Sequence, residues 1–188
     1  MDTPRLLLHT CCAPCVAYVY RLLQPDYEIT SYFYNPNIAP YDEYRIRRDE
    51  LFRFAEHEKF KVIEGERDHK RWTSRVKEYR SLGERSLRCH ECYRIRLEQS
   101  FRYAVHNNYQ LVATVLSISP HKDADMINHI GSELQEKYGV PFLKADFKKK
   151  NGFKKSVEIS REHNFYRQNY CGCIYSKLER DKNSVYSR

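Results

Sequence analysis

Short apolar runs alternate along the chain with longer segments in which apolar residues recur every three or four positions. The short runs have the length and the β-branched or aromatic content of buried strands, and they cover residues 5–10, 27–34, 61–64, 110–116 and 140–145. Helical spacing covers residues 16–23, 41–59, 68–79, 89–106, a segment that ends near residue 138, and 153–162. A short helix is expected at the C-terminal end. This alternation predicts an α/β fold with a mainly parallel sheet.

The pattern runs through the chain without a linker-like break in composition or an internal repeat. A length of 188 residues suits one compact domain. We therefore expect a single domain over residues 1–188, with a helical insertion at approximately residues 66–108. No apolar run reaches the length of a membrane span, and the three N-terminal leucines are too few for a signal peptide. The expected location is cytoplasmic, with no membrane contact.

Seven cysteines interrupt this pattern in three groups. The groups are Cys11, Cys12 and Cys15; Cys89 and Cys92; and Cys171 and Cys173. An odd number of cysteines in a reducing compartment disfavours structural disulfides. Inert buried thiols usually lie singly in apolar segments, whereas these stand beside polar or small residues such as His9, His90 and Gly172. The grouping therefore predicts metal ligation.

The spacing within the groups points to more than one inorganic site. Two Cys-x-x-Cys pairs, at 12–15 and 89–92, are typical of four-cysteine zinc, but they leave three cysteines unexplained. A [4Fe–4S] cluster also takes four thiolates. Cys11 and Cys12 are neighbours, and in an extended segment we expect them to point to opposite sides and to reach different metals. We infer two adjacent inorganic sites, and the sequence leaves open which four cysteines hold a cluster.

Two other functions are compatible with the cysteines. A strand followed by Cys12-Ala13-Pro14-Cys15 at a helix start resembles a dithiol redox motif, which would make the chain a thiol oxidoreductase. A structural zinc would instead make it a zinc-stabilised RNA-binding module. The four cysteines outside the first group favour a metal centre over the dithiol.

The positive charge gathers near the cysteines. Lys and Arg number 33 against 25 Asp and Glu, a net charge of +8. Basic residues flank the second and third groups, and tyrosines lie among them: Arg85, Arg88, Arg94, Arg96, Lys148, Lys149, Lys150, Lys154, Lys155, Arg161, Arg167 and Lys177, with Tyr93, Tyr166, Tyr170 and Tyr175. Basic side chains neutralise phosphates and aromatic faces stack on unpaired bases, so this pattern is compatible with RNA binding. A solvated surface is the alternative.

Five motifs occur in order along nearly the whole chain. They are LLLHTCCAPC (6–15), YNPNIAPYDEYRIR (34–47), RCHECYRIRL (88–97), SISPHKD (117–123) and YRQNYCGCIYS (166–176). Together they resemble the cobalamin-independent epoxyqueuosine reductases of the QueH family. The resemblance implies a domain similar to HUP and PP-loop ATPase (Rossmann-like) proteins, with a cysteine-rich C-terminal segment. The loop after the first strand carries cysteines where those relatives carry phosphate-binding glycines, which argues against ATP use.

The resemblance also implies a reaction and its cofactors. Enzymes of this family reduce the epoxide of epoxyqueuosine, in the anticodon loop of tRNA at the wobble position, to the cyclopentene of queuosine with loss of water. This is the last step of queuosine biosynthesis. It implies a [4Fe–4S] cluster, a second metal ion (iron) beside it, no cobalamin, and an electron donor that the sequence does not identify.

Roles for individual residues follow from the same resemblance. A metal-ligand role passes to all seven cysteines. Asp123 is a candidate oxygen ligand of the second metal because it follows the SISP loop, or it is a helix N-terminal charge. His9 and His121 are candidate proton donors, or structural hydrogen-bonding residues. Candidates for contact with the modified base are Asn35, Asn37, Tyr44 and Arg47; for the two asparagines the alternative is a role in shaping the turn.

Overall fold

Four parallel strands form one sheet, in the order β3-β2-β1-β4. The computed structural model describes residues 3–185, with side chains to residue 182. The strands are β1 (Arg5–His9), β2 (Glu28–Phe33), β3 (Lys61–Glu64) and β4 (Leu111–Thr114). In the register of β1, Leu7 lies opposite Thr30 on one side and Val112 on the other. The predicted α/β fold with a parallel sheet is confirmed.

The unbroken apolar sequence of β1 follows from its burial on both faces of the sheet. Leu6, Leu7 and Leu8 are completely buried. A strand covered by helices on both sides reads as an unbroken apolar run rather than an alternating one. The carboxyl end of this strand therefore lies deep in the molecule, where it delivers the first cysteine group.

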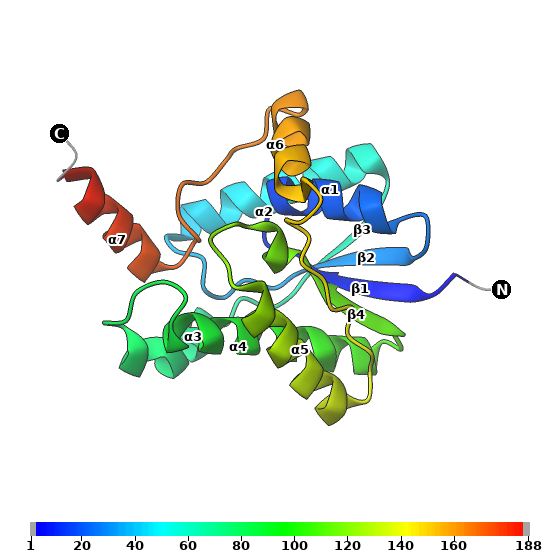
Figure 1. Cartoon of the computed structure of the whole chain (residues 1–188), viewed down its shortest axis with the longest axis horizontal. Helices are drawn as coiled ribbons and strands as arrows, with labels where there is room; N and C mark the ends of the chain where they lie inside the picture. The colour runs from blue at the N-terminus through cyan, green and yellow to red at the C-terminus, as the bar shows by residue number, and fades with distance from the viewer. Residues whose placement is uncertain (1–2, 186–188) are drawn as a thin grey trace.

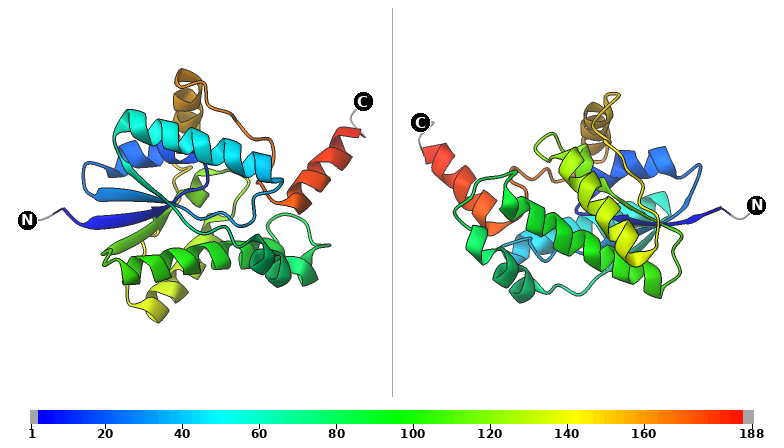
Figure 2. Two further views of the ribbon diagram at one scale, coloured as in Figure 1. Left: turned by 180° about the vertical axis from the view of Figure 1, so that it is seen from behind. Right: turned by 60° about the horizontal axis from the view of Figure 1, so that its bottom comes forward.

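Helices cover both faces of the sheet (Figures 1 and 2). One face carries α1 (Ala13–Leu23), α2 (Tyr41–Glu58) and α6 (Gly152–Glu162). The other carries α4 (Leu87–His106) and α5 (Ala124–Tyr138). The remaining helices are α3 (His69–Val76), η1 (Lys77–Tyr79), η2 (Val115–Ile118) and α7 (Ile174–Val185), of which α7 extends away from the sheet.

The predicted strand over residues 140–145 is wrong. Only Phe142 forms a β-bridge, to Val112 of β4, flanked by hydrogen bonds from Val112 N to Pro141 O and from Leu143 N to Val112 O, both 2.9 Å. Pro141 has no N–H to donate, and the chain leaves the edge of the sheet after one pairing. The predicted strand over 110–116 is shorter too, because residues from Val115 onward turn into η2.

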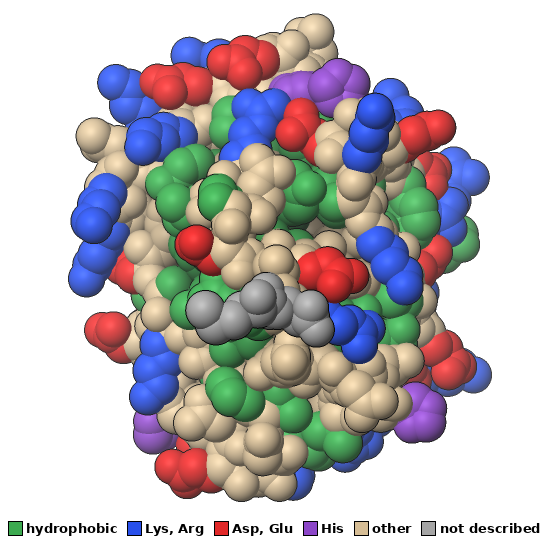
Figure 3. Space-filling view, turned by 90° about the vertical axis from the view of Figure 1, so that its right-hand side faces the viewer, with side chains coloured by type: hydrophobic (Ala, Val, Ile, Leu, Met, Phe, Trp, Pro, Cys, Tyr) green, Lys and Arg blue, Asp and Glu red, His purple; other side chains and the backbone are tan. Residues whose placement is uncertain are grey.

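The two ends of the sheet differ in what surrounds them. Where the strands begin, Lys and Arg side chains are interspersed with Asp and Glu over the surface (Figure 3). Where they end, the cysteines gather. In open parallel sheets, ligands bind beyond the carboxyl ends of the strands. Among the described helices, none is long and apolar enough to cross a membrane.

Candidate metal centre

The first cysteine group occupies the turn between β1 and α1. Cys12 is the N-cap of α1 and has extended backbone angles, φ −173° and ψ 162°. Pro14 stands in the first turn of the helix, where its missing N–H costs nothing. Cys15 follows in the same turn, so all three thiols lie at the N-terminal end of α1.

The three thiols converge on one point, and the expectation that Cys11 and Cys12 diverge is wrong. Their sulfur atoms are 3.7 Å apart. The sulfur atoms of Cys11, Cys12 and Cys15, called here the triad, all lie within 4.8 Å of one another. Side chains alternate sides only along a straight strand. Here β1 ends at His9 and α1 begins at Ala13, and the chain bends at Cys11 between them, which brings both sulfurs together.

Hydrogen bonds from three directions hold the backbone next to the triad. Thr10 N donates to Tyr32 O of β2 at 2.9 Å, and Ser31 Oγ donates to Thr10 Oγ1 at 2.7 Å. Asn35 Nδ2 donates to Thr10 O at 2.8 Å. The side-chain oxygen of Asn35, Oδ1, accepts a hydrogen bond from Arg96 Nη2 of α4 at 2.6 Å. Asn35 therefore connects the triad loop to the helix that carries the second cysteine group.

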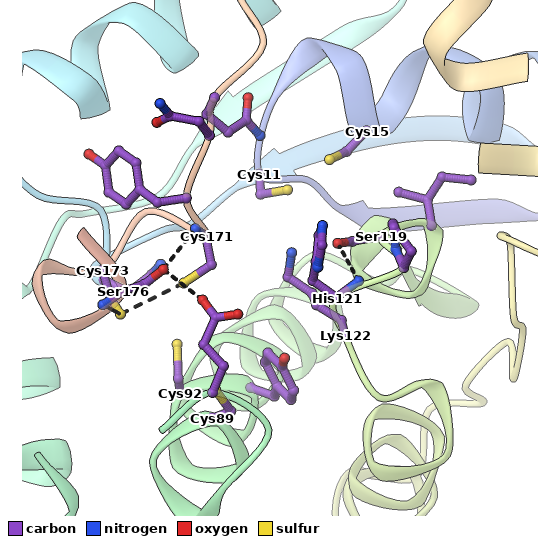
Figure 4. Close-up of a pocket in the computed structure, with 18 of the residues that line it drawn as sticks. Cys11, Cys15, Cys89, Cys92, Ser119, His121, Lys122, Cys171, Cys173 and Ser176 are labelled. Carbon is purple, nitrogen blue, oxygen red and sulfur yellow. Dashed lines mark hydrogen bonds between the residues drawn. The ribbon is translucent and has the colours of Figure 1, made fainter. Parts of the chain in front are cut away.

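The other four cysteines form a separate group, called here the tetrad. Cys89 and Cys92 lie in the first turns of α4, and Cys171 and Cys173 lie just before α7 (Figure 4). The sulfur atoms of Cys171 and Cys173 are 3.7 Å apart. Figure 4 shows Cys92 and Cys89 facing this pair across a short space. Charge repulsion among Cys89, Cys92 and Cys171 contributes to raising the pKa of Cys89, after the larger effect of burial.

Buried Arg47 holds the tetrad's C-terminal segment against α2. Arg47 Nη1 donates to Cys171 O at 3.1 Å and Nη2 donates to Tyr170 O at 3.2 Å. Arg47 Nε donates to the carboxylate of Glu43 at 2.7 Å. The backbone is tied to the loop before α2 as well, since Ala39 N donates to Gly172 O at 2.8 Å.

A second set of contacts joins this segment to the loop before α4. Cys171 N donates to Ser176 Oγ at 3.2 Å, and Ser176 Oγ donates to Glu84 Oε1 at 2.6 Å. Arg85 N donates to Cys89 Sγ at 3.3 Å. The tetrad thus depends on contacts between segments that are far apart in the chain.

In each group one thiol ionises more readily than its neighbours. Hydrogen bonding with Cys12 and then with Cys15 holds the pKa of Cys11 well below its usual range. Hydrogen bonding with Cys173 lowers the pKa of Cys171 to about 6. Burial raises the pKa of Cys89 to about 11. A ready thiolate in each group is the form that binds a metal first.

Four cations lie among the thiols. Hydrogen bonds with neighbouring cysteines have the largest effect on the pKa values of Cys11 and Cys171, and the charge of the Lys122 ammonium lowers both values further. Lys122 therefore acts on both groups. Burial lowers the pKa of Arg47, but the charges of Cys12 and Glu43 outweigh it and raise the pKa overall. The other two cations are Arg88 and Arg96. Buried anionic centres need such compensation.

The thiols of this site could hold a metal cofactor. The three sulfur atoms of the triad lie close enough together to bind one metal ion, and thiolates are preferred ligands of thiophilic metals. The tetrad supplies four thiols, which is the number that an iron–sulfur cluster takes.

Both groups open into one cavity of about 600 Å³. Six of the seven cysteines line it: Cys11, Cys15, Cys89, Cys92, Cys171 and Cys173. The loop after β4 forms another side, and Figure 4 shows Ser119, His121 and Lys122 there, across from Cys11 and Cys171. A cavity of this size holds one nucleoside-sized ligand.

The structure separates the two predicted histidines. His9 is completely buried, with Nδ1 2.8 Å from Thr114 Oγ1 and Nε2 3.3 Å from Tyr34 O, and it does not line the cavity. Burial, followed by the charge of Arg96, lowers the pKa of His9 to about 3. His121 is exposed and lines the cavity.

Asp123 caps a helix. Its Oδ1 accepts hydrogen bonds from Asp125 N and Met126 N, both 3.0 Å, at the start of α5. It is absent from the cavity lining. The structure thus shows the helix N-terminal role that the sequence offered as the alternative to metal ligation.

Of the four residues predicted to contact the base, two line the cavity and two do not. Asn35 and Tyr44 do not line the cavity, and the Tyr44 hydroxyl donates to Glu64 at 2.8 Å. Arg47 lines the cavity, but its guanidinium is committed to Glu43 and to the Tyr170–Cys171 backbone. Asn37 lines the cavity, and its buried side-chain oxygen has no hydrogen-bond partner in the part of the chain that the structure describes.

Two of the cavity residues that act on the cysteines, Lys122 and Gln168, were not singled out from the sequence. Lys122 lies inside the SISPHKD motif, and Gln168 lies inside YRQNYCGC, where its Nε2 donates to Cys12 Sγ at 3.1 Å. Only their position in the sequence could have pointed to them, since each is a polar side chain in one of the five motifs. Neither residue type is distinctive enough by itself to be chosen without the contact.

Comparison with known proteins gives consistent matches over nearly the whole chain. A family model described as "Epoxyqueuosine reductase QueH" matches residues 6–179. A protein of that name from Thermotoga maritima is 38% identical over 97% of this chain and 96% of its own length. The protein of the same name from Haemophilus influenzae is 39% identical over 95% of this chain and 74% of its own length.

A solved structure shares the fold at low sequence identity. It is described as a predicted subunit of tRNA methyltransferase from Methanocaldococcus jannaschii. The TM-score is 0.53 at 14% identity, and the match covers 81% of this chain and 74% of that one. At this identity the likeness concerns the fold alone.

Proposed function

The chain belongs to the epoxyqueuosine reductase QueH family, and from that premise we propose that it reduces the epoxide of epoxyqueuosine at the wobble position of tRNA to the cyclopentene of queuosine. It is then an oxidoreductase that acts in the last step of queuosine biosynthesis. In the balanced reaction, both C–O bonds of the epoxide break, two electrons and two protons enter, and the oxygen leaves as water. One observation carries the proposal: cysteines from three distant segments line a single cavity.

We assign the metals by group. The tetrad holds a [4Fe–4S] cluster, and the triad holds a second metal ion, for which iron is the proposed identity; cobalamin is not required. When bound, these groups supply the electrons and a Lewis acid toward the epoxide oxygen. The support is the convergence of the three triad sulfurs, the contact of Cys171 with Cys173 across from Cys89 and Cys92, and the thiolate-stabilising charge of Lys122 near both groups.

The chain's own side chains then bind the substrate and handle protons. His121 and Lys122 are N–H-bearing groups of the cavity side formed by the loop after β4, and we propose that a proton reaches the departing oxygen from this side. His9, held between Thr114 and Tyr34, supports the strand end that carries Cys11. Gln168 orients Cys12 through its amide N–H.

The substrate is a tRNA whose modified base leaves the anticodon stack and enters the cavity. Reading an unstacked base in a pocket is the usual way in which proteins recognise a loop nucleotide. Arg167, exposed on the cavity lining, would contact a neighbouring phosphate. This substrate places the reaction in the cytoplasm, with an electron donor still to be identified.

Anaerobic purification followed by iron, sulfide and metal analysis tests the cofactor assignment. The expected result is about four sulfides per chain, with iron in excess over sulfide. A zinc-only protein would identify the chain as a zinc-stabilised module instead. Incubation of the loaded protein with epoxyqueuosine tRNA and a chemical reductant tests the reaction: conversion of the epoxide to the alkene is expected, and an unchanged epoxide contradicts the function.

A further inference from the structure

Two residues that line the cavity each have a buried side-chain oxygen without a hydrogen-bond partner within the described residues. These oxygens are Oδ1 of Asn37 and Oε1 of Gln168. Asn37 is 1% exposed. Leaving a buried acceptor unpaired costs about 1–3 kcal/mol, so such atoms in cavity-lining residues call for an explanation.

The unpaired nitrogens nearby have a different explanation. Nε of Arg88 and Nε of Arg96 are also buried and have no hydrogen-bond partner among residues 3–182. Both guanidinium groups lie in the field of the tetrad thiols, Arg88 beside Cys173 and Arg96 beside Cys92. Anionic thiolates account for cations, and they cannot account for carbonyl oxygens.

The orientation of the Gln168 amide follows from its contact with Cys12. The amide NH2 is 3.1 Å from Cys12 Sγ. In this contact the amide N–H donates and the sulfur accepts. With the NH2 end facing the sulfur, the oxygen at the other end of the amide has no partner among the described residues.

Asn37 and Gln168 come from segments that lie side by side. Ala39 N donates to Gly172 O at 2.8 Å, and the Tyr170 hydroxyl donates to Ala39 O at 2.8 Å. Arg47 fixes the same stretch by its two bonds to Tyr170 O and Cys171 O. The two acceptors are thus carried by adjacent, braced segments that border the same cavity.

We propose that Asn37 and Gln168 form an acceptor pair that selects a base with two neighbouring N–H donors, the donor edge of guanine. Guanine presents its ring N1–H and its exocyclic amine side by side, whereas adenine and cytosine place a ring acceptor next to their amine. The inference rests on the proposed function, because the base of epoxyqueuosine keeps this guanine-type edge. Asn37 and Gln168 then determine which nucleotide enters the cavity.

Binding measurements on RNA test the pair without any turnover. The probes are anticodon stem-loop RNAs that differ only at the wobble base, which is guanine, inosine or adenine. The full-length, metal-loaded chain is titrated anaerobically without reductant. Each good base contact is worth a discrimination of roughly 10-fold, so guanine should bind about 10-fold more tightly than inosine and about 100-fold more tightly than adenine.

Variants then locate the preference. Asn37→Leu and Gln168→Leu should each reduce the guanine preference roughly 10-fold. Asn37→Asp keeps an oxygen acceptor and should retain the preference. Arg167→Gln is the matched control: it should weaken binding of all three RNAs alike and reduce the salt dependence.

Three outcomes overturn the inference. The first is wild-type protein that binds the three RNAs equally. The second is wild-type discrimination retained in both leucine variants. The third is an equal loss of affinity for all three RNAs in those variants, which would indicate contact with sugar hydroxyls. Because no epoxide is present, these outcomes are separate from a failure of the proposed reaction, which only the turnover assay reports.

Discussion

The triad and the tetrad consist of the same kind of side chain, but the chain brings the thiols of each group together in a different way. The triad spans five residues of one strand–turn–helix unit, and its geometry follows from where β1 ends and α1 begins. The tetrad joins the start of α4 to the segment before α7, with α5 and α6 between them in sequence. A local site forms whenever its turn forms, whereas an assembled site forms only when the tertiary contacts around it are intact.

This difference has a consequence for stability. The tetrad's C-terminal segment is held by Arg47, Ser176 and the backbone of Gly172. Damage to these contacts should affect the cluster first and leave the triad in place. The reverse is expected for damage to the turn after β1.

The largest effect should come from removing one ligand from each group. Cys171→Ser should lose the sulfide and iron of the cluster, while Cys11→Ser should keep the sulfide and lose the second metal. Both should lower turnover by at least about 100-fold, since even supporting residues of a metal site matter by 10- to 100-fold. Sulfide and metal analysis with EPR checks the assignment. Complete loss of sulfide in Cys11→Ser would show that the groups are not independent.

Removing Arg47 should destabilise the assembled group most strongly. Arg47→Met leaves Glu43 buried without its cation, and breaking a buried ion pair in this way costs about 3–5 kcal/mol. Arg48→Met on the same helix is the control, because its partially exposed pairs should cost no more than about 1 kcal/mol. The free energy of unfolding from chemical denaturation measures both. Equal costs would mean that Arg47 does not brace the tetrad segment.

Gly172→Ala probes the same segment through its backbone. Gly172 has φ +117°, and an added Cβ would lie 2.9 Å from Arg47 Nη1. The strain should cost about 1–3 kcal/mol and reduce the sulfide bound per chain. Gly83→Ala is the control, since an added Cβ there meets nothing within 4 Å. A cluster content unchanged by Gly172→Ala would argue against the importance of this turn.

The smallest effect is expected at Asp123, which lies outside both groups. Asp123→Ala removes the N-cap of α5 and should lower the free energy of unfolding by about 1 kcal/mol. Metal and sulfide content should be unchanged, and thermal denaturation with metal analysis measures both. Loss of the second metal in this variant would restore Asp123 as an oxygen ligand. Asp125→Ala, in the first turn of the same helix, serves as the control.

Much of the architecture was accessible from the pattern of apolar residues. The Leu6–Leu8 run predicted a buried strand, and the periodicity of residues 41–59 predicted α2 almost to its ends. The pattern failed at residues 140–145, where apolar character reflects packing of Phe142 against the core rather than a strand. Composition reports burial, and burial alone does not distinguish a strand from a packed loop.

The candidate site was predictable in its residue types and less so in its arrangement. The clustering of cysteines indicated metals because thiols seldom gather without one. The expectation that Cys11 and Cys12 diverge came from strand geometry applied to a turn. Asn35 and Asn37 look alike in the sequence, but the Asn35 amide is satisfied by Thr10 and Arg96, whereas Asn37 lines the cavity and its buried Oδ1 has no partner among the described residues.

The sequence by itself determined most of the elements in their order, the grouping of cysteines that could hold a metal, and the family. Each of these depends on residue types and on spacing over short distances. Only the tertiary structure decided the division of the thiols into triad and tetrad, the position of Lys122 beside both, and the two unpaired acceptors. These depend on which distant segments meet and on which polar atoms remain without partners when they do, and neither is encoded in local spacing.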